Sequence, residues 1–219
     1  LGVIGGTGSG KSTFAAMLSR LYEPDGGAVY IGGRNIAEIP LATLRANIGL
    51  VMQEGYVYSR TVGENIGIAA NEPTPEEIEN AAKSACVHDN ILGFAGGYDT
   101  AVGERGVTLS GGQRQRVAIA RALMRDVPVL VFDDSLSAVD SRTDAAVRAN
   151  LKSKFAGATV IIISHRINTV IDADNIIVLD GGKIVESGTG AQLVEKGGIF
   201  AEIYKKQTAL PEDLEGGAL

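Results

Sequence analysis

Cysteine, long apolar runs and excess positive charge are all scarce in this sequence of 219 residues. Cys86 is the only cysteine, so no disulfide can form within the chain. No stretch approaches the roughly 18 consecutive apolar residues that a membrane-spanning helix needs, and no signal-peptide pattern is present. The formal net charge of −6 argues against a nucleic-acid-binding surface, so we expect no nucleic-acid partner.

Apolar residues, by contrast, are plentiful enough for a full core. They make up 45% of the chain, and several continuous runs read as strands buried on both faces, at 48–52, 129–132 and 159–163. Helical patterns separate these runs, so the sequence predicts an α/β fold with a mostly parallel sheet. The chain begins at Leu1 rather than Met, inside a predicted core strand, and we expect it to be part of a longer polypeptide.

The stretch 5–13, GGTGSGKST, fits the phosphate-binding pattern G-x-x-x-x-G-K-[ST]. An apolar strand at 1–4 precedes it and a helical pattern follows it, as the motif requires. Backbone N–H groups of such a loop, and the helix N-terminus behind it, attract phosphate oxygens. Lys11 is predicted to reach the β and γ phosphates, and the Ser12 hydroxyl to bind Mg²⁺. The predicted nucleotide-binding residues are Gly6, Thr7, Gly8, Ser9, Gly10, Lys11, Ser12 and Thr13.

Polar residues follow the predicted strands at the ends where α/β proteins bind ligands. Gln53 follows 48–52 and could hold a metal ion or a water, although an ordinary loop glutamine is equally consistent with the sequence alone. Asp133 and Asp134 end the strand 129–132, where two carboxylates are costly unless a cation or a proton transfer uses them. His165 follows 159–163 and is a candidate catalytic group.

A second glycine-rich helix start lies in the middle of the chain, where the stretch 60–110 has little strand character. Ser110, or a glycine after it, is expected to cap a helix over 114–125, which makes a second anion-binding device; a plain helix cap is the alternative. Upstream, Thr74 begins a predicted capping box with Pro75 at the first helical position. His88 lacks any metal-ligand spacing and is expected to pack or to lie at the surface.

The C-terminal part is predicted to contain a helix over 141–155, a β-hairpin over 175–187, a last helix over 200–207 and a loose tail.

In order, these motifs resemble the nucleotide-binding domain of an ATP-binding cassette (ABC) transporter over nearly the whole chain. Gln53 matches the Q-loop position, Leu109–Gln113 the LSGGQ signature, and 129–133 the Walker B strand. Ser137–Asp140 matches the D-loop, and His165 matches the switch histidine. The segments 59–66 and 98–106 resemble those of multidrug or lipid exporters.

The resemblance implies one cassette over 1–219, with a helical subdomain at about 60–125 and a loose tail at 208–219. Its N-terminal antiparallel strands, and the aromatic residue that stacks on adenine, would precede Leu1. ATP and Mg²⁺ are the implied cofactors, with Ser12, Gln53 and Asp133 as the metal site. Lys11, Gln53, Asp134 and His165 are the implied catalytic residues.

The resemblance also implies a head-to-tail pair of such domains with ATP between the P-loop of one and the signature of the other. Ser110, Gly111, Gly112 and Gln113 would then contact ATP that the second domain holds. A membrane-spanning domain, fused upstream or separate, would place the chain at the cytoplasmic face of the cell membrane.

One position departs from the family pattern. The residue after the Walker B aspartate is normally a glutamate that activates water, and here it is the shorter Asp134. The change resembles the weakened half of heterodimeric exporters, so a different partner chain is expected in preference to a second copy. Two other functions stay open: a mainly regulatory ATP-binding half, and a soluble ABC ATPase of DNA repair or translation. The distance from Gln53 to Leu109 is too short for the coiled coil of the repair type.

Overall fold

The computed structural model describes residues 1–103, 106–137 and 139–209. Glu104 and Arg105 of the exporter-like segment, Ala138 of the D-loop match and most of the expected tail lie outside these ranges. The chain forms two compact units, one of Leu1–Lys11 together with the chain from Ile162 onward, and the other of Ser12–Ile161.

The first unit is built around strand β1 (Gly2–Gly5), all of which is buried. Strand β6 (Thr159–Ile163), through its last two residues, and strand β7 (Ile176–Asp180) flank β1 and run parallel to it. Strand β8 (Lys183–Gly188) pairs antiparallel with β7 and completes the predicted hairpin. The predicted strand before the P-loop is therefore present, one residue further along than expected.

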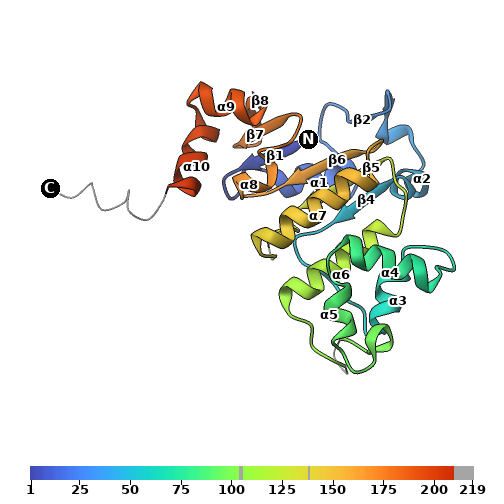
Figure 1. Cartoon of the computed structure of the whole chain (residues 1–219). Coiled ribbons are helices and arrows are strands. Elements are labelled where there is room, and N and C mark those ends of the chain that lie inside the picture. The colour runs from blue at the N-terminus through green and yellow to red at the C-terminus, as the bar shows by residue number, and fades with distance from the viewer. Residues whose placement is uncertain (104–105, 138, 210–219) are drawn as a thin grey trace. The chain divides into compact units, whose positions relative to one another are not determined.

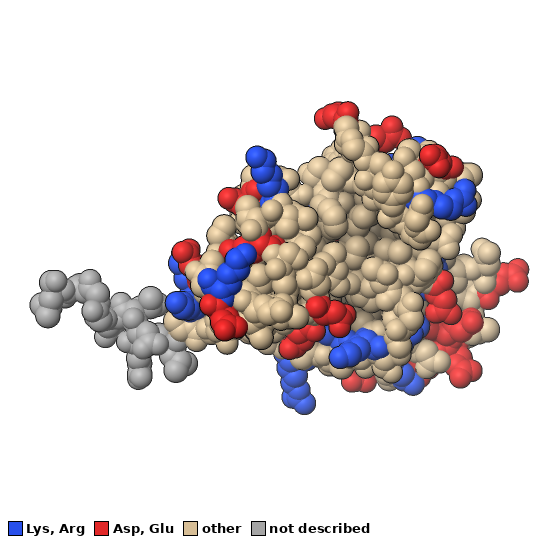
Figure 2. Space-filling view, turned by 90° about the horizontal axis from the view of Figure 1, so that it is seen from above, with Lys and Arg blue, Asp and Glu red and all other residues tan. Residues whose placement is uncertain are grey.

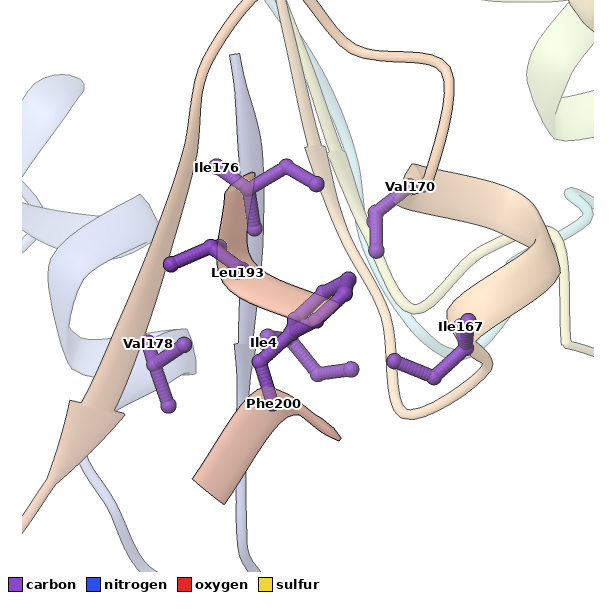
Figure 3. Close-up of a cluster of buried hydrophobic side chains, with 7 residues drawn as sticks. All are labelled: Ile4, Ile167, Val170, Ile176, Val178, Leu193 and Phe200. Atoms are coloured by element: carbon purple, nitrogen blue, oxygen red, sulfur yellow. The ribbon is translucent and has the colours of Figure 1, made fainter. Parts of the chain in front are cut away.

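Helices α8 (Ile167–Val170), α9 (Gly190–Lys196) and α10 (Ile199–Thr208) belong to the same unit. Figure 3 shows its core, in which strand and helix side chains meet. The buried cluster consists of Ile4, Ile167, Val170, Ile176, Val178, Leu193 and Phe200. The predicted last helix is confirmed as α10, whereas α8 and α9 were not predicted because each is too short for a periodic pattern.

The second unit holds strands β4 (Ile48–Val51) and β5 (Val129–Asp133), which are parallel, with Val51 opposite Phe132. The first residues of β6 continue this set, as the N–H of Thr159 donates to Pro128 O at 2.8 Å. Helix α1 (Lys11–Leu18) crosses the boundary between the units in sequence. Because β1 is parallel to β6 and β7, and β4 is parallel to β5, the α/β fold with a mostly parallel sheet is confirmed.

The second unit also contains several elements outside the segment between β4 and β5. They are the two-stranded ribbon of β2 (Tyr30–Ile31) and β3 (Arg34–Asn35), the 3₁₀ turn η1 (Ile36–Glu38), helix α2 (Leu41–Ala46) and helix α7 (Ser141–Lys154).

Helices dominate the segment between β4 and β5, which is green to yellow-green in Figure 1. They are α3 (Val62–Gly67), α4 (Pro75–Ser84), α5 (His88–Leu92), the 3₁₀ turn η2 (Gly97–Asp99) and α6 (Gly111–Leu123). The predicted capping box at Thr74 is confirmed, with Pro75 as the first helical residue.

The expected bounds of α6 were wrong at both ends. The helix begins at Gly111 rather than at residue 114, because Ser110 is its N-cap, and it ends at Leu123 rather than at residue 125.

Candidate functional site

The P-loop connects β1 to α1 and is shaped by its glycines. Gly8 and Gly10 have φ angles of 77° and 98°, a region that glycine adopts without steric cost. A Cβ atom added at Gly6 or Gly8 would meet no atom within 4 Å. The loop therefore presents backbone next to open space, as a phosphate-binding loop requires.

The other side of the loop is packed closely against the β7–β8 hairpin. A Cβ at Gly5 would collide with Leu179 O and Ser9 Oγ, so only glycine fits there. The N–H of Gly182, in the hairpin turn, donates to Ser9 O at 3.2 Å. The hairpin thus supports the P-loop from behind, a role that the sequence did not predict.

Lys11 is the first residue of α1 and is only 6% exposed. Its ammonium donates to Gly5 O at 2.9 Å, to Gly6 O at 2.7 Å and to Ser9 Oγ at 3.4 Å. A buried cation needs such oxygen partners, and phosphate oxygens are of the same kind with more negative charge. Ser12 and Thr13 follow in the first turn of α1 and are exposed.

In the second unit, the end of β5 holds buried polar groups. Asp133 is 3% exposed, Asp134 8% and Ser135 0%. Asp134 has a φ of 45°, in the left-handed region that aspartate tolerates better than most residues. Its carbonyl oxygen accepts hydrogen bonds from Ser137 N at 3.2 Å and Ser137 Oγ at 2.6 Å. The backbone of Asp134 is therefore held from within its own turn.

Gln53 follows β4, and Asp133 is the last residue of β5, so the second unit places both at the carboxyl ends of paired parallel strands. Gln53 is exposed. Just before it, Met52 O accepts a hydrogen bond from Gln115 Nε2 of α6 at 3.0 Å. Just after it, a Cβ at Gly55 would lie 2.8 Å from the backbone of Arg114. The segment around Gln53 is thus attached to α6, the helix whose first residues belong to the signature.

Arg121 of α6 extends this attachment and was missed by sequence reasoning. Its guanidinium donates to Tyr56 O at 3.0 Å and to Asn65 O at 2.8 Å, and it lies 5.1 Å from the ring centroid of Tyr58. Burial lowers the pKa of Arg121 from its ordinary value. Asn65, which is 0% exposed, binds both the N–H and the carbonyl of Tyr58, at 2.8 and 3.0 Å. Because α6 contains several arginines, nothing in the sequence distinguishes Arg121 from the others.

The signature forms a complete capping box at the start of α6. Ser110 Oγ accepts from Gln113 N at 3.2 Å, and Gln113 Oε1 accepts from Ser110 N at 2.9 Å. The expectation that Ser110 caps this helix is confirmed. The first N–H groups of a helix have no acceptor within it, and the box serves only its own two residues. Within the described part of the chain, the box provides no acceptor for the N–H groups of Gly111 and Gly112, which can therefore face an outside acceptor.

His165 lies in the first unit, two residues after the end of β6, and is exposed. The preceding residue is fixed to β1, since Ser164 N donates to Val3 O at 3.0 Å. Because β1 and β6 are parallel neighbours, His165 and the P-loop both follow the carboxyl ends of paired strands. The first unit therefore brings Lys11 and His165 to the same edge of its sheet, while Gln53, Asp133, Asp134 and the signature belong to the second unit.

His88 makes the packing contact that its isolation in the sequence predicted. Its Nδ1 lies 2.9 Å from the hydroxyl of Tyr98. Burial, with a smaller effect of the Glu79 carboxylate, raises the pKa of Tyr98 to about 12. Among the described residues, no group of three or more His, Cys, Asp and Glu is arranged to hold a metal ion.

On the face that Figure 2 shows, acidic and basic side chains of the described residues are interspersed around the edge. Within the described ranges, no helix is both long and apolar enough to span a membrane.

A model of the ABC transporter family matches residues 1–137, which include the P-loop, Gln53, the signature and the Asp133–Asp134 pair. The chain belongs to the ABC transporter family. It is a nucleotide-binding domain of that family, and the resemblance inferred from its motifs is confirmed.

The similar proteins within the ABC family are exporters and transporters. The chain is 43% identical to the human mitochondrial iron-sulfur clusters transporter ABCB7, over 94% of its own length and 28% of that protein. It is 42% identical to the beta-(1→2)glucan export ATP-binding/permease protein NdvA of Rhodopseudomonas palustris, over 97% of its length and 35% of that protein. A solved structure of a bacterial Atm1-family ABC exporter with ATP bound matches with a TM-score of 0.91 and 40% identity, over 96% of this chain and 37% of that one. The chain thus spans about a third or less of these two relatives.

Proposed function

We propose that this domain binds and hydrolyses ATP and thereby drives export across a membrane. The observation that carries the proposal is the P-loop, in which a buried lysine ammonium sits over loop carbonyls beside open, glycine-lined space. Support comes from the structural neighbour, whose name states that it has ATP bound, and from relatives named as exporters.

The donor set of the chain fits a nucleoside triphosphate with Mg²⁺. In this proposal the N–H groups of 6–13 surround the phosphates, and Lys11 neutralises charge on the transferring group. Ser12 and Gln53 would hold Mg²⁺ directly and Asp133 through water, which suits a hard cation that prefers oxygen ligands. The ion would supply charge stabilisation to the β and γ phosphates.

Hydrolysis requires a base for the attacking water. Asp134 would accept the water proton as the water oxygen bonds to the γ phosphorus and the bond to the leaving ADP oxygen breaks. His165 would contact the γ-phosphate and the attacking water, and Gln53 would help to orient that water. Aspartate is one methylene shorter than glutamate, and a misplacement near 1 Å costs about 100-fold in rate. We therefore propose a slow hydrolysis step at this P-loop.

The site also needs a second domain. Ser110, Gly111, Gly112 and Gln113 would bind ATP held by that domain, since the N–H groups of the two glycines await an outside acceptor. We further propose a helical subdomain at about 60–125, a membrane-spanning domain, and a place at the cytoplasmic face of the membrane. The preference for a different partner chain rests on Asp134 alone; the relatives and the structural neighbour do not support it, and it stays a prediction.

The test is ATP turnover by the natural full-length protein in lipid vesicles. We expect turnover that depends on Mg²⁺ and transport that depends on ATP. Absence of both nucleotide binding and turnover would contradict the proposal.

A regulatory ATP-binding role is the second candidate, favoured by the short Asp134 in its left-handed turn. Asp134→Asn would then leave much of the turnover, while Glu→Asn at the matching partner position would remove nearly all of it. A fully active homodimer, or total loss through Asp134→Asn alone, would exclude this role and the heterodimer with it.

A further inference from the structure

The loop that carries His165 is held by one side chain from the C-terminal helix of the same unit. Gln207, in the last turn of α10, donates from Nε2 to His165 O at 2.7 Å. Its Oε1 accepts the N–H of Ile167 at 2.8 Å. One amide group therefore binds both ends of a three-residue segment that lies some 40 positions earlier in the chain.

We propose that Gln207 is a positioning residue for His165, and that it sets the rate of ATP hydrolysis through the backbone of this loop. The proposal rests on the function proposed above, in which His165 contacts the γ-phosphate. Gln207 does not touch the nucleotide in this scheme.

Helix α8 explains why the loop needs this partner. It begins at Ile167, and its N-cap, Arg166, makes no side-chain capping hydrogen bond. The N–H of the first helical residue has no acceptor inside a helix. Gln207 Oε1 supplies that acceptor from another helix, so the start of α8, directly after His165, depends on α10.

The chemistry of the contact is specific for a carboxamide. The segment offers one carbonyl and one N–H, and a glutamine amide carries a donor group and an acceptor at one planar end. A carboxylate would match the N–H of Ile167 but would place an oxygen against His165 O. A lysine would match only the carbonyl.

Helix α10 is itself fixed firmly enough to act as a support. Phe200, in its first turn, is 0% exposed and packs in the cluster of Figure 3 together with Ile167. Its N-cap residue is Gly198, which has no side chain that could cap the helix. Instead, the carboxylate of Glu186 on β8 accepts hydrogen bonds from the N–H groups of Ile199 at 2.5 Å and Phe200 at 3.2 Å. The N-terminal end of α10 is thus tied to the sheet and its C-terminal end to the His165 loop.

The backbone on both sides of His165 is bonded to other elements of the same unit. Ser164 N binds β1 on one side of His165, and Gln207 binds the carbonyl of His165 and the residue after Arg166 on the other. Loss of Gln207 would remove both bonds from α10 and leave the bond of Arg166 N to Ser164 Oγ at 3.0 Å, so the histidine would spend less time where hydrolysis needs it. The hydrolysis rate should fall, while ATP binding through the P-loop should not change.

The experiment compares variants of the natural full-length protein in lipid vesicles. Gln207→Ala and Gln207→Glu should each lower kcat for ATP about tenfold, with KM within about twofold of wild type. Lys206→Ala, an exposed neighbour on the same helix turn, should leave kcat unchanged. If Gln207→Ala keeps the wild-type kcat while His165→Ala loses it, the positioning role is wrong and the proposed function stands. If His165→Ala keeps the wild-type kcat, the role of His165 fails and the present proposal fails with it.

The double variant separates positioning from a general effect on stability. Because Gln207 acts through His165, the double change His165→Ala with Gln207→Ala should hydrolyse ATP as fast as His165→Ala alone. A further drop by the full factor of Gln207→Ala would overturn the proposal.

Amide hydrogen exchange gives a readout that needs no activity. In Gln207→Ala the peptide covering 164–170 should exchange faster, while the peptide around Phe200 should not change. Unchanged exchange over 164–170 would contradict the contact itself. Faster exchange in both peptides would show general loosening of α10 and would also overturn the proposal.

Discussion

The chain has two helices that begin in glycine-rich segments, α1 and α6. At both starts the first N–H groups have no acceptor within the helix, and the two segments differ in how they compensate for this. At the start of α1, Gly8 and Gly10 of the P-loop have positive φ angles, and the cation of Lys11 is bound to loop carbonyls. At the start of α6, Ser110 and Gln113 satisfy each other's N–H groups, and Arg114 Nη1 donates to Leu109 O at 2.7 Å. Both helix ends offer N–H groups to an anion.

The difference lies in how complete each device is. The P-loop has its own charge, its own backbone cradle and a supporting hairpin, so we expect it to bind phosphate within one chain. The signature uses part of its polar groups to hold its own shape and has only two glycine N–H groups to offer. The comparison explains why one motif is expected to bind nucleotide alone, while the other is expected to add to a site that a second domain brings.

Removing the cation near each helix start should give the largest contrast. Lys11→Ala should weaken ATP binding by about 10- to 100-fold, because charge-assisted bonds to phosphate are lost. Arg114→Ala should leave ATP affinity at the P-loop unchanged, because the Arg114 guanidinium donates its hydrogen bond to Leu109 O. Titration calorimetry with Mg²⁺ and ATP measures both. Equal effects of the two changes would break the comparison.

Adding a methyl group at each helix start should give the second-largest contrast between the P-loop and the signature. Gly10→Ala forces alanine to a φ of 98°, which costs about 1–3 kcal/mol, and it should also weaken ATP binding. Gly111→Ala places its Cβ in open space, with Arg114 Nη2 4.0 Å away, so the free energy of unfolding should stay within about 0.5 kcal/mol of wild type.

Chemical denaturation and ATP titration check both variants, and the Gly111 variant should lose turnover only in the paired, full-length protein. If Gly111→Ala instead weakened ATP binding by the isolated domain, the signature would not be the incomplete device described above.

The capping boxes of α6 and α9 offer a smaller and closely matched test. Ser110→Ala and Thr189→Ala each remove a side-chain acceptor for the third helical N–H, so each should cost about 1 kcal/mol of unfolding free energy. Only the Ser110 change should also reduce ATP turnover. A similar loss of turnover through Thr189→Ala would mean that capping in general, and not the signature, controls the rate.

The smallest effect concerns a third helix start, that of α7. Asp140 accepts hydrogen bonds from Thr143 N at 3.0 Å and Thr143 Oγ1 at 2.7 Å, and these bonds lower the pKa of its carboxyl below the ordinary 3.8. A depressed pKa in the folded state means that the stabilisation is full above the unfolded value and is lost as the pH falls through the folded value.

The difference in unfolding free energy between wild type and Asp140→Ser should therefore be constant at neutral pH and should shrink below pH 3.8. Urea unfolding over a pH series measures it, and a difference that grew in acid would contradict the assigned bonds.

Local patterns determined much of this protein from the sequence. The Thr74–Pro75 cap, the strand at 159–163, the hairpin and the P-loop between a strand and a helix all depend on neighbours within a few residues, and all were predictable. The family followed from motif order, since each motif type performs a fixed chemical task.

Only the tertiary structure decided the supports of the site, because their partners lie far apart in the chain. Gln207 and the His165 loop, Arg121 and the segment around Tyr56, and the hairpin turn behind Ser9 join residues that no local pattern connects. The positive φ angle of Asp134 could not be predicted from the sequence either, because aspartate adopts several backbone conformations. The turn closed by Ser137 selects one of them. Residue types and their spacing indicate which chemical groups the site contains. The positions of those groups depend on long-range packing and hydrogen bonds that form only when the chain is folded.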